Sequence, residues 1–148
     1  MHPMPPAPTS CVFCAIARGD APAAVVLRTE GLCAFLDARP VFKGHVLIIP
    51  EAHVPDLDSL EQVGALFELA QRVSRAVQVA LGAQGTFVAV NNKISQSVPH
   101  LHVHVVPRSK GDGLRGFFWP RGKYDSDQER DQVARALAAA LAALPARS

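Results

Sequence analysis

Residues 95–108 read SQSVPHLHVHVVPR and hold three of the six histidines in this 148-residue chain. His100, His102 and His104 alternate with apolar residues, and a period of two residues is that of a β-strand with two different faces. The pattern predicts a strand from about 98 to 106. Its three imidazoles would lie about 6–7 Å apart along one face, and the intervening apolar side chains would pack under a helix.

Patterns on both sides of this segment predict the rest of the fold. Two helices are expected where apolar residues at helical spacing follow capping boxes, at Ser59 with Gln62 and at Ser126 with Glu129. Gly82 suits the position just after the first helix. The expected elements are strands at 23–28, 32–38, 45–50 and 85–91 and helices at about 59–81 and 126–144. This order predicts an α+β fold with a mainly antiparallel sheet, a long helix and a C-terminal helix.

Composition and charge narrow the class of protein. With 49% hydrophobic and 19% charged residues, the chain is expected to be one soluble globular domain. A net charge of +2 does not favour a nucleic-acid partner, and no apolar run reaches the roughly 20 residues that span a bilayer. Residues 1–10 are proline-rich and lack the apolar core of a signal peptide, so we expect a flexible N-terminal tail on a cytoplasmic protein.

The histidine segment is compatible with two kinds of chemistry. Strand H-x-H pairs bind zinc, and a zinc-dependent hydrolase is one interpretation, although no acidic residue follows closely as a further ligand. Imidazole is also a nucleophile that forms covalent intermediates, and neighbouring imidazoles can hold the oxygens of a phosphate. Gln96 and Ser97 would add an amide and a hydroxyl at the same end of the strand.

Residues 100–106, HLHVHVV, match the signature His-φ-His-φ-His-φ-φ, in which φ is apolar, and here the chain resembles the histidine triad (HIT) family. The similarity begins at CVFCAIARGDAP and is weaker after residue 108. The resemblance implies a HIT domain at 11–148, with its triad core at 11–108 and a C-terminal loop and helix at 109–148. It also implies a homodimer with one continuous sheet across the interface.

The resemblance further implies hydrolysis or nucleotidyl transfer at the α-phosphate of purine nucleotide derivatives, either phosphoramidates or dinucleoside polyphosphates. His102 would attack phosphorus and form a nucleotidyl-histidine intermediate that water resolves. His104 would contact the α-phosphate, and His100 would orient the site from behind. Ser97 and Gln96 would lie near the phosphate and the leaving group.

The same resemblance places the nucleoside against the first half of the chain. Asp37 matches the acid that binds the ribose hydroxyls, and a carboxylate does accept two hydrogen bonds from a vicinal diol. Asn91 would reach the phosphate or a neighbouring loop. The positions that enclose the base are Val12, Phe13, Ile16, Phe35 and Ala38.

Cys11 and Cys14 form a C-x₂-C pair, and in a reducing compartment this spacing favours zinc over a disulfide. The family contains zinc-binding members with two cysteines and two histidines, and His53 and His100 complete that set here. We expect a closed structural site that joins the N-terminal segment to the histidine strand. Cys33 is expected to be a core residue.

Two other functions stay open: a purine-nucleotide-binding module with little turnover, and the zinc-dependent hydrolase. Magnesium would enter only with a polyphosphate substrate. Ser95 stands where relatives carry glycine before Gln96, which changes the flexibility of the loop beside the phosphate. Trp119 is expected on a mobile loop that closes over the substrate or across the dimer.

Overall fold

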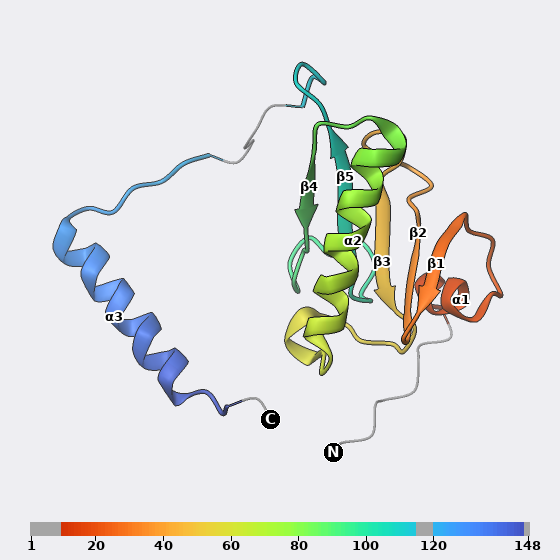
Figure 1. The fold of residues 1–148 in the computed structure, drawn as a ribbon. Coiled ribbons are helices and arrows are strands. Elements are labelled where there is room, and N and C mark those ends of the chain that lie inside the picture. The colour runs from red at the N-terminus through yellow and green to blue at the C-terminus, as the bar shows by residue number, and fades with distance from the viewer. Residues whose placement is uncertain (1–9, 115–119, 147–148) are drawn as a thin grey trace. The chain divides into compact units, whose positions relative to one another are not determined.

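The computed structural model describes residues 10–114 and 120–146. Contacts between residues divide the chain into two compact units, 1–112 and 113–148. The first unit contains the five-stranded sheet with helices α1 and α2, and the second contains α3 (Figure 1). The tail predicted at 1–10 and Trp119 lie outside the described residues, apart from Ser10.

The sheet has the strand order β1-β2-β3-β5-β4, and every neighbouring pair is antiparallel. The predicted α+β class with a mainly antiparallel sheet is therefore confirmed. The strands are β1 (Val25–Thr29), β2 (Leu32–Leu36), β3 (Val46–Pro50), β4 (Gly85–Ala89) and β5 (Val103–Arg108).

The histidine strand is shorter than predicted. β5 begins at Val103, so the expected strand was wrong over 98–102. Pro99 has no N–H for a strand ladder, and the N–H of His100 donates to the carbonyl of Val98 at 2.8 Å in a tight turn. The alternation of faces nevertheless holds, because the apolar residues between the histidines enter the core under α2.

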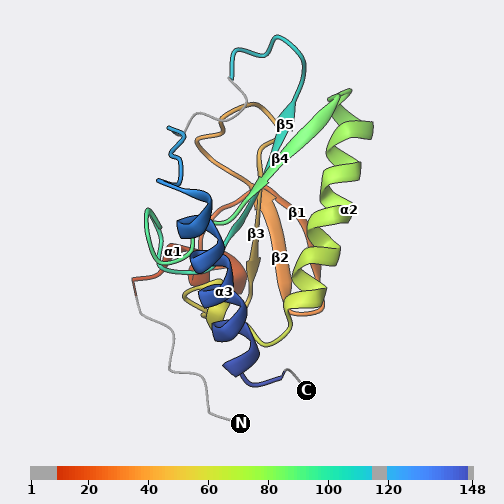
Figure 2. The same cartoon turned by 90° about the vertical axis from the view of Figure 1, so that its left-hand side faces the viewer.

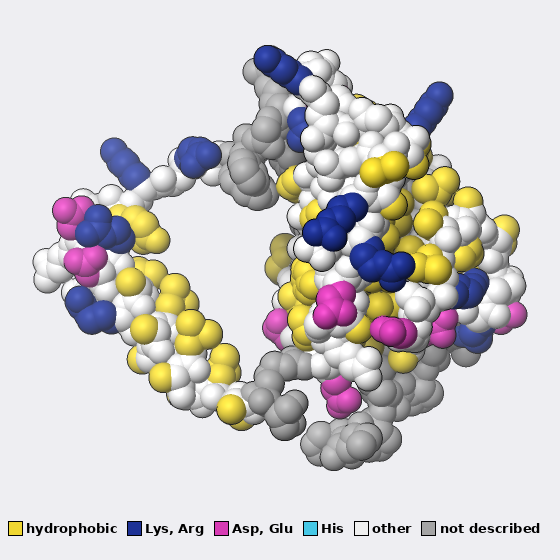
Figure 3. Space-filling view, viewed as in Figure 1, with side chains coloured by type: hydrophobic (Ala, Val, Ile, Leu, Met, Phe, Trp, Pro, Cys, Tyr) yellow, Lys and Arg dark blue, Asp and Glu magenta, His cyan; other side chains and the backbone are white. Residues whose placement is uncertain are grey.

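Helix α2 (Val63–Leu81) lies along one face of the sheet (Figure 2). Its apolar side packs on buried residues of β2, β3 and β5, and Gly82 ends it in the left-handed conformation at φ 67°, as predicted. The α2 side of the molecule shows no histidine side chain among the described residues (Figure 3). On the opposite face, Phe13 of the core cluster there contacts the rings of His100 and His102.

The predicted start of this helix was wrong. Ser59 belongs to a separate 3₁₀ turn at Leu57–Ser59, where Asp56 is the cap and accepts from the N–H of Ser59 at 3.0 Å. Helix α2 begins four residues later, and Gln62 at its N-cap makes no side-chain capping bond. The S-x-x-Q pattern was therefore a chance match, because Ser59 is inside the turn that Asp56 caps and α2 starts without a side-chain cap.

Helix α1 (Val12–Arg18) was not predicted from the sequence. It covers the face of the sheet opposite α2, where its apolar side chains pack with residues of β2 and β3. Gly19 ends it at φ 82°. Arg28 of β1 donates through its guanidinium to the carbonyls of Ala17 at 2.8 Å and Ile16 at 3.1 Å. Seven residues are too few for stability as an isolated helix, so tertiary contacts must hold α1.

A tight turn precedes β3 at Gly44, whose φ is +98°. An L-residue rarely adopts this conformation. A Cβ at this position would also collide with the side chain of Leu81 at the end of α2. The turn leads directly into His45, which is 3% exposed.

The second unit contains α3 (Asp127–Ala143). Ser126 caps it by accepting from the N–H of Glu129 at 3.0 Å, which confirms the second predicted cap. Hydrophobic side chains run along this helix (Figure 3). Among the described residues no helix is long and apolar enough to cross a membrane.

Candidate active site and metal cluster

A pocket of about 930 Å³ opens on the α1 side of the sheet. Its walls come from α1, the end of β2 with the residues after it, and the segment that leads into β5. Most residues singled out from the sequence meet here. They are Val12, Phe13, Ile16, Phe35, Asp37, Ala38, Ser97, His102 and His104.

Gln96 and Asn91 are not among the residues that line this pocket. The amide nitrogen of Gln96 donates to the carbonyl of Pro55. Asn91 is exposed, while its neighbour Asn92 accepts from the N–H of Leu57 at 2.9 Å. The roles assigned to Gln96 and Asn91 at a phosphate stay predictions.

His102 is held with one ring nitrogen turned to the backbone. Its Nδ1 lies 2.8 Å from the carbonyl oxygen of His100 and must donate to it, because a carbonyl only accepts. In the neutral ring Nε2 therefore carries the lone pair, which is the form a nucleophile needs. The ring is 4% exposed, and Phe13 packs edge-on against it at a centroid distance of 5.1 Å.

His104 is bonded to a fourth histidine that the sequence analysis missed. His45 Nε2 lies 3.0 Å from His104 Nδ1, and the N–H of Val41 donates to His45 Nδ1 at 3.1 Å. The proton of neutral His45 must therefore be on Nε2, which donates to His104. His104 in turn carries its proton on Nε2 and can donate it to an oxygen in the pocket.

Both of these rings are neutral near pH 7. Burial lowers the pKa of His104 to about 4, with smaller contributions from His102 and His45. Burial also lowers the pKa of His45, although the carboxylate of Asp37 opposes the shift. The pocket therefore offers a neutral hydrogen-bond donor beside the ring of His102, whose centroid is 5.0 Å from that of His104.

Asp37 lies just after β2 at the edge of the same pocket. Its N–H donates to the carbonyl of His45 at 2.9 Å, and its Oδ1 accepts from the N–H of Arg39 at 2.9 Å. Its Oδ2 lies 3.7 Å from His45 Nδ1. The carboxylate thus has one fixed oxygen, and the pocket side keeps acceptor capacity for a ligand diol.

The four predicted metal ligands come together behind the pocket. His100 Nδ1 lies 3.4 Å from Cys11 Sγ and 3.5 Å from Cys14 Sγ, and His53 Nδ1 lies 3.2 Å from Cys14 Sγ. All four ligand atoms are within 4.8 Å of one another. His100 donates from Nε2 to the carbonyl of Pro50 at 2.8 Å, so its Nδ1 is free to bind a cation. The donor set fits a closed tetrahedral zinc site.

The thiol of Cys14 is protonated unless a cation binds. Burial raises the pKa of Cys14 to about 11, and the neighbouring Cys11 adds to the shift. A metal ion would therefore displace the proton of Cys14 on binding. Cys33 is buried in the core, as expected.

A second group, Asp37 with His45 and His104, also places three donor atoms within 4.8 Å. It does not suit a metal, because Nδ1 of His45 accepts from Val41 and Nε2 carries the proton. If that proton moved to Nδ1, the Nδ1–H of His45 would face the N–H of Val41, and neither could accept a hydrogen bond. The two histidines are better described as a hydrogen-bonded chain that begins at the N–H of Val41, with Asp37 beside it.

Comparisons with known proteins agree with this geometry. The chain matches the HIT domain over residues 18–111. It is 37% identical over 139 residues to an uncharacterized HIT-like protein of Mycobacterium tuberculosis, which covers 89% of this chain and 93% of that one. A crystal structure of a HIT family member from Bacillus subtilis superposes with a TM-score of 0.80 at 31% identity, covering 93% of this chain and 99% of that one. The chain belongs to the histidine triad family.

Some relatives carry more specific names. A Zn-bound histidine triad protein from Mycobacterium smegmatis is 39% identical, with a TM-score of 0.68 over 91% of this chain and 98% of that one. An adenosine 5′-monophosphoramidase of Schizosaccharomyces pombe is 35% identical over 75% of this chain and 84% of its own length. An adenylylsulfatase of Arabidopsis thaliana is 31% identical, and the match covers 91% of this chain and 71% of that protein. An asymmetrical bis(5′-nucleosyl)-tetraphosphatase of S. pombe is 34% identical, and the match covers 60% of this chain and 50% of that protein.

Proposed function

We propose that this chain is a hydrolase or nucleotidyl transferase that acts at the α-phosphate of purine nucleotide derivatives. The observation that carries the proposal is the orientation of His102, whose Nδ1–H is bound to the carbonyl of His100 while the ring borders the pocket. Relatives named for a phosphoramidase, an adenylylsulfatase and a dinucleoside tetraphosphatase support the substrate class. In all three names the substrate is a nucleotide derivative.

The chemistry is a double displacement. His102 Nε2 attacks the α-phosphorus, the bond to the leaving group breaks, and the leaving group departs with a proton supplied near Ser97 or His104. Water then attacks phosphorus, the P–N bond breaks, and the nucleoside monophosphate is released. His104 donates from Nε2 to a phosphoryl oxygen, Asp37 binds the ribose diol, and Phe13 with Phe35 holds the base. Magnesium would accompany only a polyphosphate substrate.

Intact-protein mass spectrometry tests this scheme. After brief exposure to adenosine phosphoramidate or a dinucleoside polyphosphate, an adenylyl adduct should appear on wild type and be absent from His102→Ala. Retained binding of adenosine monophosphate by the variant shows that the pocket is intact. Binding without turnover on any such substrate would instead favour the nucleotide-binding module.

We also propose that Cys11, Cys14, His53 and His100 bind zinc in a structural role. The donor geometry and the Zn-bound relative support this. The zinc-dependent hydrolase is the competing function, and chelation separates the two: turnover that disappears on chelation while the protein stays folded and binds nucleotide would favour it. The three described cysteines are free thiols, which suits a cytoplasmic protein.

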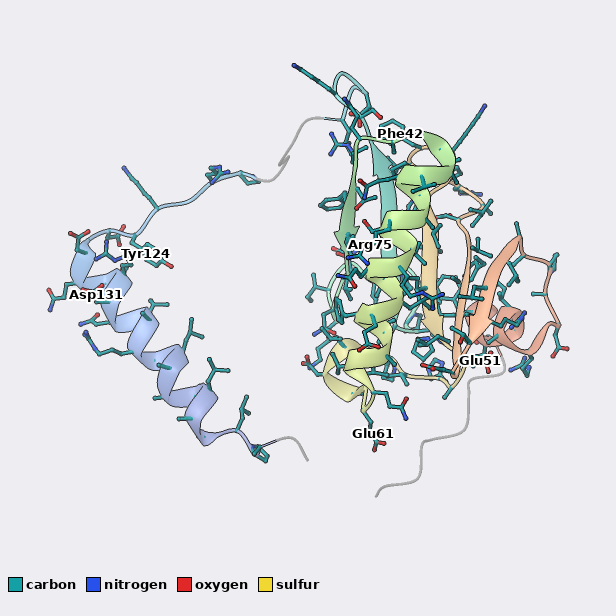
Figure 4. All side chains as sticks on the ribbon, viewed as in Figure 1. Phe42, Glu51, Glu61, Arg75, Tyr124 and Asp131 are labelled. Carbon is teal, nitrogen blue, oxygen red and sulfur yellow. The ribbon has the colours of Figure 1, made fainter. Side chains whose placement is uncertain are left out.

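A homodimer is proposed through the open edge of β4. This strand pairs only with β5 within the described residues. Beside it lies a groove between α2 and β4 that Phe67, Arg75 and Val88 help to line, with Arg75 on α2 (Figure 4). Phe67 and Val88 are 41% and 42% exposed, so the groove presents apolar surface beside this open edge.

A further inference from the structure

Helix α1 is a wall shared by the metal cluster and the nucleotide pocket. Cys11 and Cys14 lie at its start and point to the cluster. Val12, Phe13 and Ile16 of the same short helix line the pocket. A displacement of α1 therefore changes both sites together.

The helix is held at its two ends by different groups. At its start, the cluster joins α1 to His53 and His100. At its end, the guanidinium of Arg28 bonds the carbonyls of Ala17 and Ile16. Because so short a helix has little stability of its own, these two contacts act together with the packing of its apolar side chains on β2 and β3 to set the position of the pocket wall.

A second route runs from the cluster to the nucleophile. The side chain of His100 belongs to the cluster, while its backbone carbonyl accepts the Nδ1–H of His102. Phe13 packs against both rings, with centroid distances of 5.9 Å to His100 and 5.1 Å to His102. Metal bound to His100 would thus fix the group that orients His102.

We propose that metal binding at the cluster and nucleoside binding in the pocket are thermodynamically coupled through α1, with Arg28 as a positioning residue at the opposite end of the helix. The coupling rests on the proposed zinc site and on the proposed nucleotide binding. Linkage is reciprocal: the factor by which zinc strengthens nucleoside binding equals the factor by which the nucleoside strengthens zinc binding.

Calorimetric titration with adenosine, which lacks the phosphate that would itself bind Zn²⁺, tests the coupling under reducing conditions. Zinc loading of chelator-stripped protein should lower the Kd of adenosine at least about fivefold. Saturating adenosine should tighten Zn²⁺ binding by the same factor in competition with a chromophoric chelator. Equal adenosine affinity in the two folded forms would overturn the coupling while leaving both proposed sites in place. No adenosine binding by either form would overturn the proposed function as well.

Arg28→Gln provides an independent test in zinc-loaded protein. It should weaken adenosine binding about threefold to tenfold, the size expected for the net loss of one ordinary hydrogen bond. Arg72→Gln, the same charge change on exposed α2, is the matched control and should bind as wild type does. If the zinc-free protein loses its far-ultraviolet circular dichroism signal and is therefore unfolded, the comparison of Arg28→Gln with Arg72→Gln in zinc-loaded protein tests the proposal instead. Equal affinities of the folded Arg28→Gln and Arg72→Gln proteins would refute the positioning role.

Discussion

His45 Nε2 and His104 Nδ1 lie 3.0 Å apart, although 59 residues separate them in the chain. The N–H of Val41 sets the direction of this bond by occupying the other nitrogen of His45. Because burial keeps His104 neutral, its one ring proton is then on Nε2, on the pocket side. One backbone amide outside the histidine segment thereby determines which nitrogen of a ring inside it can donate into the pocket.

Replacing His45 should test this hydrogen-bonded chain. His45→Leu removes the donor to His104, and we expect kcat/KM to fall by about 10- to 100-fold, the cost of losing a hydrogen bond that orients a buried group. His45→Gln can donate to His104 and accept from Val41, so it should recover much of that loss. Nitrogen-15 shifts of His104 should report the Nε2–H tautomer in wild type and in His45→Gln. An unchanged tautomer in His45→Leu would contradict this account.

The free energy of unfolding should decrease as the pH is lowered, and His104 should contribute to that decrease. Its folded-state pKa of about 4 is below the ordinary value near 6.5. Between these values the unfolded chain binds more protons, so stability is lost as the pH falls from 6.5 towards 4. In calorimetric scans His104→Gln should show a smaller decrease in Tm over this window than wild type. Acid release of metal affects both proteins, so identical pH profiles would remove His104 as a cause.

Asp37 should contribute to affinity through the ribose. Asp37→Asn keeps the shape but weakens the acceptor, and we expect KM for an adenosine phosphoramidate to rise about tenfold. A 2′,3′-dideoxy substrate should show the same loss with wild type and little further loss with the variant. Asp20→Asn on the surface is the control for charge. Additive losses in the double comparison would show that Asp37 does not bind the diol.

Association through β4 should depend on the neighbouring groove. Phe67→Glu places a charge in that groove, so light scattering after size exclusion should show a larger monomer fraction. Val79→Glu is the matched control, because Val79 is on the same helix, is 87% exposed and does not line the groove. A wild-type protein that is monomeric at high micromolar concentration would contradict the proposed dimer.

Periodic patterns predicted the parts of the fold whose burial is repetitive. Alternation in β5 and helical spacing in α2 identify the core face of each element, since one wrong register would expose every apolar residue on it. Helix α1 gives no such signal. Its seven residues make only about two turns, which is too short for a repeated apolar spacing, and contacts from elsewhere in the chain hold it in place. Ser59 instead lies in a 3₁₀ turn capped by Asp56, and the capping-box pattern could not distinguish that turn from the start of α2.

The site was predictable in its motif residues and not in their partners. Cys11 and Cys14 carry a ligand spacing of their own, and the histidine segment shows its alternation directly. His45 shows neither, since its role comes from a hydrogen bond across β3 and β5. Contacts of this kind join residues that are distant in the sequence, so they produce no local sequence pattern.

The turn at Gly44 makes position 44 intolerant of substitution although it touches no ligand. A residue other than glycine would strain the backbone immediately before His45, while the flexible end of the Leu81 side chain could move aside. A replacement at this position can therefore disturb the hydrogen-bonded chain through the backbone alone, without altering any residue of the pocket.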